Sequence, residues 1–242
     1  MLLLDVGNSR CKWALVENGA WTHQGVADNT EWLAMQRNFD MFSPPNRIVI
    51  SNVGGDMMAQ RVRNICSMWP LQAEFVLAKS EQCGVKNKYE NPARLGSDRW
   101  AALIAARKRS ERACLVVNCG TATTIDALSD AGEFLGGLIM PGITLMQQSL
   151  KYNTAQLQDA EGELQNFPRN TADAIQSGVI QATLGAIAYQ GALLKNLGTH
   201  KTIACILSGG AADKIQAHLG MNAERVDNLV LEGLKIIGEA SA

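Results

Sequence analysis

A glycine-containing turn near the N-terminus carries the first residues that could do chemistry. Asp5 and Gly7 end a short apolar run, and the basic residues Arg10 and Lys12 follow closely. Glycine lets backbone amides approach a ligand, and basic side chains add positive charge, so the segment has the parts of a phosphate cradle built on a β-hairpin. It matches neither a Walker A loop nor the Gly-x-Gly-x-x-Gly dinucleotide fingerprint. Taken alone, such a turn is more often only a hairpin.

A second turn of the same kind lies 113 residues later, where Asn118-Cys-Gly120-Thr121 aligns with Asp5-Val-Gly-Asn. Each turn follows an apolar strand and precedes another strand and a second turn. Chance similarity is the alternative, but the matching order favours an internal duplication. Two such loops facing each other across a cleft could hold a triphosphate. Asp5 would then orient a hydrated Mg²⁺, because that ion keeps several waters and takes one or two carboxylates.

A third cluster, Gly96-Ser97-Asp98-Arg99, stands at the start of an expected helix. It offers free amides, a carboxylate and a guanidinium together, which suits an acidic substrate whose hydroxyl must lose a proton. The plainer alternative is that Ser97 or Asp98 only caps the helix.

Two further glycine-rich segments, Gly136-Gly137…Pro141-Gly142 and Ser208-Gly209-Gly210, are predicted to be strand-to-helix turns. Either can be only a tight turn, although the second also suits a flat adenine ring lying against bare backbone.

The elements that must position these groups alternate along the whole chain, which predicts an α/β fold. In the first part we expect strands at 2–6, 12–17, 21–26, 47–53 and 73–77, and helices at 31–39, 57–68 and from 97 or 98 to 106. In the second part we expect strands at 113–117, 123–128, 134–139 and 202–207, and helices at 141–152, 171–197, 212–219 and 229–239. The predicted halves are therefore 1–112 and 113–242.

Composition excludes several classes of protein. The 242 residues carry 22 Lys and Arg against 23 Asp and Glu, a net charge of −1, so a nucleic-acid-binding surface is not expected. No stretch approaches the roughly 18 apolar residues of a membrane span. The apolar start at Leu2–Leu4 reaches Asp5 at once and is too short for an export signal, so we expect a cytoplasmic protein.

The cysteines and histidines exclude other kinds of site. None of the six cysteines forms a Cys-x-x-Cys pair, so they are expected to be small buried residues rather than metal ligands. The three histidines have no ligand spacing and are expected at the surface. Carboxylates, hydroxyls, amides and basic side chains are left to do any chemistry.

Together these motifs resemble the type III pantothenate kinases. Asp5 to Trp13 looks like their first phosphate motif, Tyr89 to Arg99 like their pantothenate and catalytic motif, and Asn118 to Asp126 like their second phosphate motif. The glycine-rich turns and Asn170-Thr171…Ser177-Gly178 follow in the expected order, so the resemblance covers essentially the whole chain.

The resemblance implies duplicated ribonuclease H-like halves of the acetate-and-sugar-kinase/Hsp70/actin fold, with ATP in the cleft between them. It implies phosphorylation of pantothenate to 4′-phosphopantothenate, the first step of coenzyme A synthesis, with ATP and Mg²⁺. It also implies a homodimer in which the partner subunit completes the pantothenate pocket.

Site residues follow from the same resemblance, position by position. Asp98 is implied to be the proton acceptor. The implied ATP-binding residues are Asp5, Val6, Gly7, Asn8, Ser9, Arg10, Cys11, Lys12 and Thr121. The implied pantothenate-binding residues are Tyr89, Gly96, Ser97, Asp98, Arg99 and Thr171.

Asn118 departs from the family pattern, because members commonly carry Asp there as the ligand of an activating K⁺ or NH₄⁺. The amide keeps an oxygen but loses the charge, which puts the monovalent-cation site in doubt. Two alternatives stay open: a kinase of this fold for a sugar or acyl substrate, and a nucleotide-binding regulator with weakened catalysis. Only Asn118 favours the regulator, whereas Asp5, Asp98 and Arg99 oppose it.

Overall fold

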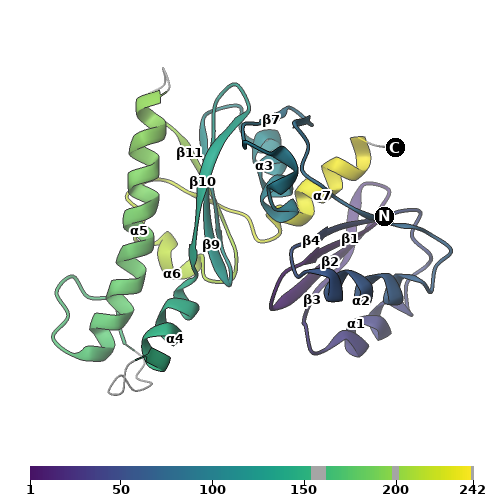
Figure 1. Ribbon diagram of the computed structural model, residues 1–242, viewed down its shortest axis with the longest axis horizontal. Helices are drawn as coiled ribbons and strands as arrows, with labels where there is room; N and C mark the ends of the chain where they lie inside the picture. The colour runs from purple at the N-terminus through teal and green to yellow at the C-terminus, as the bar shows by residue number, and fades with distance from the viewer. Residues whose placement is uncertain (154–161, 198–201, 241–242) are drawn as a thin grey trace. The chain divides into compact units, whose positions relative to one another are not determined.

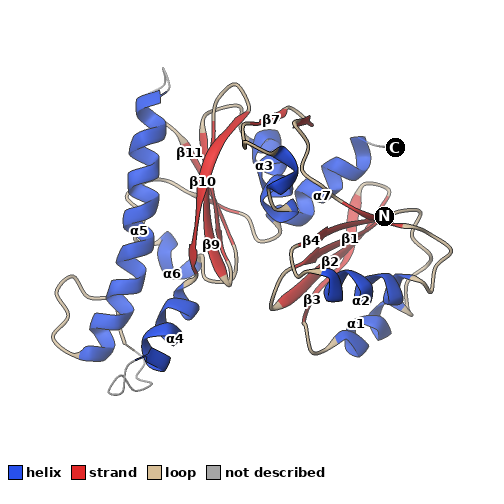
Figure 2. Ribbon diagram, viewed as in Figure 1, coloured by secondary structure: helices blue, strands red, loops and turns tan. Residues whose placement is uncertain are grey.

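The computed structural model describes residues 1–153, 162–197 and 202–240, and the chain divides into two compact units. The first unit comprises Met1–Arg109 and Asn228–Ala242, and the second comprises Ser110–Asp227. Figure 1 labels their helices and strands, and Figure 2 distinguishes the two kinds of element by colour. Each unit is described by itself.

The first unit is built on a five-stranded sheet with the order β3-β2-β1-β4-β5, flanked by helices. β1 and β2 pair in antiparallel fashion, as do β2 and β3, whereas β4 and β5 continue the sheet in parallel. The strands of this sheet are β1 (Leu2–Val6), β2 (Arg10–Glu17), β3 (Ala20–Asp28), β4 (Ile48–Asn52) and β5 (Ala73–Phe75). The unit also contains the short strands β6 (Glu81–Gln82) and β7 (Val85–Asn87), which pair with each other as an antiparallel hairpin outside this sheet. Its helices are α1 (Trp32–Phe39), α2 (Asp56–Cys66), the short 3₁₀ turn η1 (Pro92–Arg94), α3 (Ser97–Arg109) and α7 (Leu229–Ala240).

Alternation along these strands sends successive side chains to opposite faces of the sheet. Leu2, Leu4 and Val6 of β1 join one apolar core with residues of α1 and α2. The other face receives α3 and α7, which also pack on each other and are tied by an Arg109–Glu232 ion pair of 2.7 Å. Leu3 and Asp5 share this second face. The unusual residue is therefore Asp5, a carboxylate on a strand that is otherwise apolar on both faces.

The second unit repeats this plan with the strand order β12-β11-β8-β9-β10. Its strands are β8 (Cys114–Cys119), β9 (Ala122–Leu128), β10 (Glu133–Pro141), β11 (Ala204–Ser208) and β12 (Glu224–Arg225). Its helices are α4 (Ile143–Asn153), α5 (Thr171–Leu197) and α6 (Asp213–Gln216). Alternate residues of β8, among them Leu115 and Val117, form a core with α5 residues such as Val179 and Ile187.

The two sheets correspond strand for strand. In each, the first strand pairs antiparallel with the second, the second antiparallel with the third, and the first parallel with the fourth. The fourth strand pairs parallel with the fifth. Shared order and shared strand directions confirm the duplicated α/β fold that the sequence predicts.

The expected halves and the compact units differ in the place of the C-terminal helix. We expected helix 229–239 in the second half, but α7 belongs to the first unit because it packs on α3, β1 and β4. The division at 112 and 113 stays a prediction about the sequence repeat.

Several local predictions were wrong. Gly136 and Gly137 lie inside β10, at a register shift after Phe134, and only Pro141-Gly142 leads into α4, which begins at Ile143. The helix expected at 212–219 is only the four residues of α6. The β6–β7 hairpin was not predicted, because its strands are too short to show alternation. Its turn, Cys83-Gly84, has positive φ at both residues, and cysteine is not a usual signal for that turn.

The predicted environments of the cysteines and histidines are largely confirmed. All six cysteines are free, and five of them are buried, while Cys83 is half-buried. His23 and His218 are exposed, and His200 lies outside the described residues. Within the described ranges, the helices include none that is both long enough and apolar enough to cross a membrane.

Candidate active site

Asp5 lies in the middle of a polar strip on the α3 face of the first sheet. Lys12 on β2 is its partner in the antiparallel ladder, and Ser51 on β4 is its partner in the parallel ladder. Residues directly opposite on neighbouring strands point to the same face, so an acid, a base and a hydroxyl stand side by side. Val6 and Cys11 point to the opposite face and are buried in its core, so only their main chains are available to a ligand.

The loop that joins β1 and β2 is short and exposed. The backbone N–H of Gly7 donates to the carbonyl of Arg10 at 3.0 Å, which closes the loop around Asn8 and Ser9. Arg10 pairs with Asp28 at 3.1 Å, with both side chains more than half exposed, so this ion pair adds little stability. The loop therefore presents backbone and positive charge to solvent beside Asp5.

The N-terminus of α3 is fixed to the same sheet face by hydroxyl groups. Ser97 and Ser51 share a buried hydrogen bond of 2.9 Å, and the backbone N–H of Asn52 donates to Ser97 Oγ at 3.2 Å. Ser97 is the first residue of α3, and its hydroxyl is engaged with β4. Asp98 lies in the first turn, and its Oδ1 accepts from the backbone N–H of Arg99 at 2.8 Å.

The carboxyl groups of Asp5 and Asp98 lie within electrostatic reach of each other. Burial and then the charge of Asp98 raise the pKa of Asp5 to about 7, against the opposing effect of Lys12. Burial also raises the pKa of Asp98, although the amide and the charge of Arg99 oppose that shift. Raised carboxyl pKa values are typical of groups that take up a proton during catalysis.

These carboxylates also fit a divalent metal ion. The charge of Asp98 raises the pKa of Asp5, so Asp5 needs a nearby cation to be fully charged. Mg²⁺ requires only one or two protein carboxylates, because waters and phosphate oxygens complete its shell. The described residues contain no group of three or more His, Cys, Asp or Glu side chains that could hold a metal ion.

Tyr89 and Arg99 form the adjoining part of the site. Arg99 is 6% exposed, its Nη1 donates to the Tyr89 hydroxyl at 3.5 Å, and its guanidinium lies 5.8 Å from the centre of the Tyr89 ring. The buried Asn87 supports both sides of this turn, since its Oδ1 accepts from the Tyr89 N–H and its Nδ2 donates to the Pro92 carbonyl. Ser97 and Asp98 of the predicted pantothenate motif lie beside the strip around Asp5, and Gly96 adjoins Asp98. Tyr89 and Arg99 of the same motif contact each other.

In the second unit, Asn118 occupies the position that corresponds to Asp5. It is flanked by Thr124 on β9 and Ser208 on β11, so this strip is polar but uncharged at the strand ends. The nearest carboxylate along β9 on that face is Asp126, which is 1% exposed. The weakened monovalent-cation site stays a prediction.

The second loop, Gly120-Thr121, resembles the first in its backbone. The N–H of Gly120 donates to the Ala122 carbonyl at 3.0 Å, and the Thr121 carbonyl accepts from the Gly142 N–H at 2.9 Å. Gly209 follows β11 with φ +96°, and a side chain there would collide with the backbone of Cys119. The turn after β11 therefore lies close to this loop, as an adenosine-binding turn would require.

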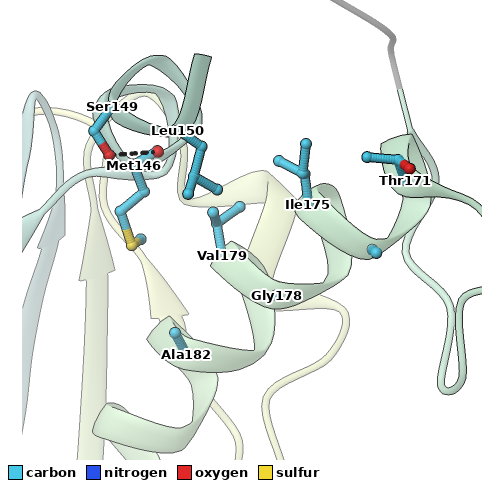
Figure 3. Close-up of a pocket in the computed structure, with 9 residues that line it drawn as sticks. Met146, Ser149, Leu150, Thr171, Ile175, Gly178, Val179 and Ala182 are labelled. Atoms are coloured by element: carbon cyan, nitrogen blue, oxygen red, sulfur yellow. Dashed lines mark hydrogen bonds between the residues drawn. The ribbon is translucent and has the colours of Figure 1, made fainter. Parts of the chain in front are cut away.

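Thr171 opens α5 in the second unit and lies at one end of an apolar groove of about 430 Å³ between α4 and α5. Figure 3 shows Met146 and Leu150 of α4 opposite Val179 and Ala182 of α5, with Thr171 at the far end of the groove. The structure thus places Thr171 in a different unit from Asp98.

Sequence reasoning missed two contributors to the site. Ser51 gave no motif signal, and only its position one residue before the end of β4 could have indicated it. Asn29 follows β3 and contacts the Gly7–Ser9 loop, but Asn-Thr after an acidic residue suggests no more than a turn.

Two duplicated sheets of this topology, each with a glycine-containing hairpin loop, define the class of the acetate-and-sugar-kinase/Hsp70/actin proteins. Solved structures of this class agree along nearly the whole chain. A Campylobacter jejuni protein described as a Baf family transcriptional activator has a TM-score of 0.65 at 22% identity and covers 100% of this chain and 98% of its own. A Sinorhizobium meliloti protein described as a 2-dehydro-3-deoxygalactonokinase has a TM-score of 0.58 at 14% identity, covering 99% and 98%. At these identities the likeness shows the fold alone.

Sequence relatives identify the family within that class. The model of the type III pantothenate kinase family matches residues 1–192. A type III pantothenate kinase from Nitrosospira multiformis is 44% identical over 242 residues, 100% of this chain and 92% of the relative. One from Aromatoleum aromaticum is 43% identical, with 100% and 99% covered. The chain belongs to the type III pantothenate kinase family, whose members phosphorylate pantothenate with ATP in coenzyme A biosynthesis. It is therefore an enzyme, and the regulator without catalysis is not favoured.

Proposed function

We propose that Asp98 is the general base in the transfer of the γ-phosphoryl group of ATP to the 4′-hydroxyl of pantothenate. Asp98 accepts the hydroxyl proton as the oxygen attacks the γ-phosphorus, the bond to the β,γ-bridging oxygen breaks, and ADP leaves. The raised pKa of Asp98 carries this proposal, since a carboxylate with weakened acidity holds a proton better during transfer. Phosphoryl transfer otherwise needs mainly positioning and charge neutralisation.

Asp5 and Lys12 prepare the phosphate side of the reaction. Asp5 would hold a hydrated Mg²⁺, whose charge would relieve the repulsion between Asp5 and Asp98 and neutralise phosphate oxygens. Lys12 and the backbone of the Gly7–Ser9 loop contact the triphosphate, as does Thr121 in the second loop. The ion itself supplies electrostatic stabilisation only, and the proton moves to Asp98.

Arg99 and Tyr89 hold pantothenate, which carries a carboxylate. A buried guanidinium is a strong partner for a carboxylate because the pair is little screened by solvent. Ser97 is tied to β4 and keeps the start of α3, and with it Asp98, in a fixed position.

A second copy of the chain covers the groove between α4 and α5 and completes the pantothenate pocket with Thr171. Helix α5 has no charged residue between Asp173 and Lys195, and it leaves Tyr189 and Leu193 substantially exposed. An uncharged helix that borders an apolar groove is typical of a helix–helix interface. A two-fold interface repeats each contact, so one dimer would carry two composite sites in a cytoplasmic enzyme.

The test begins with an ATP-dependent phosphorylation assay that compares pantothenate with a sugar and an acyl substrate. Asp98→Asn and Thr171→Arg are then each prepared as inactive variants and mixed under subunit exchange. If sites are composite, a mixed dimer has one site with both lesions and one with neither, so part of the activity returns. Demonstrated exchange without recovery would place both residues in one subunit's site or remove Thr171 from the site.

A further inference from the structure

Asn29, the residue that follows β3, holds three successive carbonyl groups of the loop between β1 and β2. Its side-chain Nδ2 donates to the carbonyl oxygens of Gly7 at 3.0 Å and Asn8 at 2.8 Å. Its backbone N–H donates to the carbonyl oxygen of Ser9 at 3.0 Å. One residue outside every predicted motif thus contacts each peptide unit of the loop.

These contacts determine which way the loop's amides face. In a trans peptide the C=O of one residue and the N–H of the next point in opposite directions, and the described chain contains no cis peptide bond. The N–H groups of Asn8, Ser9 and Arg10 are therefore directed to the side of the loop away from Asn29. A row of amides on one side of a loop is the arrangement that binds anions.

Asn29 is itself held in place. Arg61 Nη1 donates to the Asn29 carbonyl at 3.2 Å. Asn29 Oδ1 is buried and has no hydrogen-bond partner, so the side chain is oriented by its two Nδ2 bonds alone. A buried amide oxygen without a partner costs free energy, and such a cost in a native structure calls for a functional reason.

The segment between β4 and α2 holds the loop from another direction. The N–H of Val53 donates to the Val6 carbonyl at 2.9 Å, and a Cβ on Gly54 would lie 3.0 Å from the Gly7 carbonyl oxygen. The Gly7 peptide is thus confined by Asn29 and by the close approach of Gly54. The conformation of the loop is therefore set by these neighbours together with the hydrogen bond between Gly7 and Arg10.

We propose that Asn29 is a positioning residue for ATP, which keeps the Gly7–Ser9 loop in the conformation whose amides receive the phosphates. This inference rests on the proposed role of that loop in binding the triphosphate. Asn29 touches neither substrate and acts only through the loop. Its removal lowers the affinity for ATP and leaves the pantothenate pocket at Tyr89 and Arg99 unchanged.

The test measures KM for each substrate in Asn29→Ala and in the isosteric Asn29→Asp. We expect the KM for ATP to rise about tenfold in Asn29→Ala, as the loss of one to two hydrogen bonds would give. Asn29→Asp should be worse, because a carboxylate oxygen then faces two carbonyl oxygens. The KM for pantothenate and the far-ultraviolet circular dichroism should not change. The matched control is Asn64→Ala, since Asn64 borders the same surface groove as Asn29 but its side chain accepts a hydrogen bond from Gln60.

Lys12→Met separates this inference from the proposed function. In one outcome, Lys12→Met has a raised KM for ATP, while both folded Asn29 variants have normal KM values. That outcome would overturn the role of Asn29 but would still support the proposed binding of the triphosphate by the loop. Normal values in all three would overturn both. An equal rise in the KM for ATP and the KM for pantothenate in an Asn29 variant would show a general structural defect. That result would also overturn the positioning role of Asn29.

Amide hydrogen exchange on the unaltered enzyme gives a second measurement that needs no variant. A non-hydrolysable ATP analogue should slow exchange at Asn8, Ser9 and Arg10. Unchanged exchange at a saturating concentration of the analogue would overturn the proposed orientation of the amides, even if the Asn29 variants failed to fold.

Discussion

The ends of the central strands differ between the two units although the sheets share one topology. In the first unit Asp5 lies between Lys12 and Ser51, whereas in the second Asn118 lies between Thr124 and Ser208. The first strip carries two opposite charges and the second carries none. After duplication, the scaffold has been kept in both copies, while the charged side chains at these strand ends are found in the first.

The helices that follow the fifth strands differ in the same way. α3 begins with Ser97, Asp98 and Arg99, and α7 begins with the apolar residues Leu229 to Leu231. Both helices pack in the first unit. There α3 carries the proposed base, whereas α7 contributes apolar side chains to the packing. Four predictions test this division of labour.

The largest expected effect comes from Asp98, the second residue of α3, where α7 has Val230. If Asp98 is the base, Asp98→Asn folds normally and loses about 10²–10⁴-fold in kcat, the usual worth of a general base. Steady-state kinetics and circular dichroism provide the measurement. Asp56→Asn, in the first turn of α2, is the control and should change only stability, by less than about 1 kcal/mol. Near-normal turnover in folded Asp98→Asn would leave Asp98 with a structural role.

The next largest effect is on the free energy of unfolding, because the folded protein is destabilised when Asp5 is charged. Its pKa is raised from 3.8 to about 7 on folding, so the folded state binds the proton more tightly and stability falls as pH rises from about 4 through 7. Without nucleotide or Mg²⁺, Asp5→Asn should therefore be more stable than the unaltered enzyme at pH 8, by about 1–3 kcal/mol after allowance for partial exposure. The gain should shrink below pH 7 and vanish near pH 4. Urea unfolding at several pH values measures it, and a constant difference would contradict the raised pKa.

A smaller effect is expected from the hydroxyl pair that joins β4 to α3. Ser97→Ala leaves Ser51 Oγ and the Asn52 N–H without their partner in a buried place, which should cost about 1–2 kcal/mol. The double variant Ser51→Ala with Ser97→Ala should cost less than the sum of the single changes. Ser67→Ala, at the exposed end of α2, serves as the control in the same denaturation experiment. Additive costs would show that the two hydroxyls do not support each other.

The smallest expected effect is on the dependence of activity on monovalent cations, and it concerns Asn118 in the second unit. With neutral Asn118, activity should change by less than about twofold between K⁺ and Na⁺ at fixed ionic strength, since no charge holds the ion. Asn118→Asp should introduce stimulation by K⁺ or NH₄⁺. A steep K⁺ requirement in the unaltered enzyme would show that backbone carbonyls or Asp126 provide a cation site despite the substitution.

The sequence by itself determined the larger features of this protein. Apolar runs and turn residues located all the longer strands and helices, and the repeat of Asp5-x-Gly at Asn118-x-Gly predicted the duplication, because both signals are local in the chain. The ordered motifs also indicated the family. Patterns in the sequence could not show the β6–β7 hairpin or the short length of α6. These elements have too few residues to show the periodicity of a strand or a helix.

Only the tertiary structure decided which side chains meet. It brought Ser51 to Ser97 and the charge of Asp98 to Asp5, and it placed α7 against α3 rather than with the second half. It also showed Asn29 holding the phosphate loop. These relations depend on strand register and on burial, which arise from the packing of segments far apart in the chain. A pKa of about 7 for a strand carboxylate is a property of that assembly, because burial and a neighbouring charge produce it.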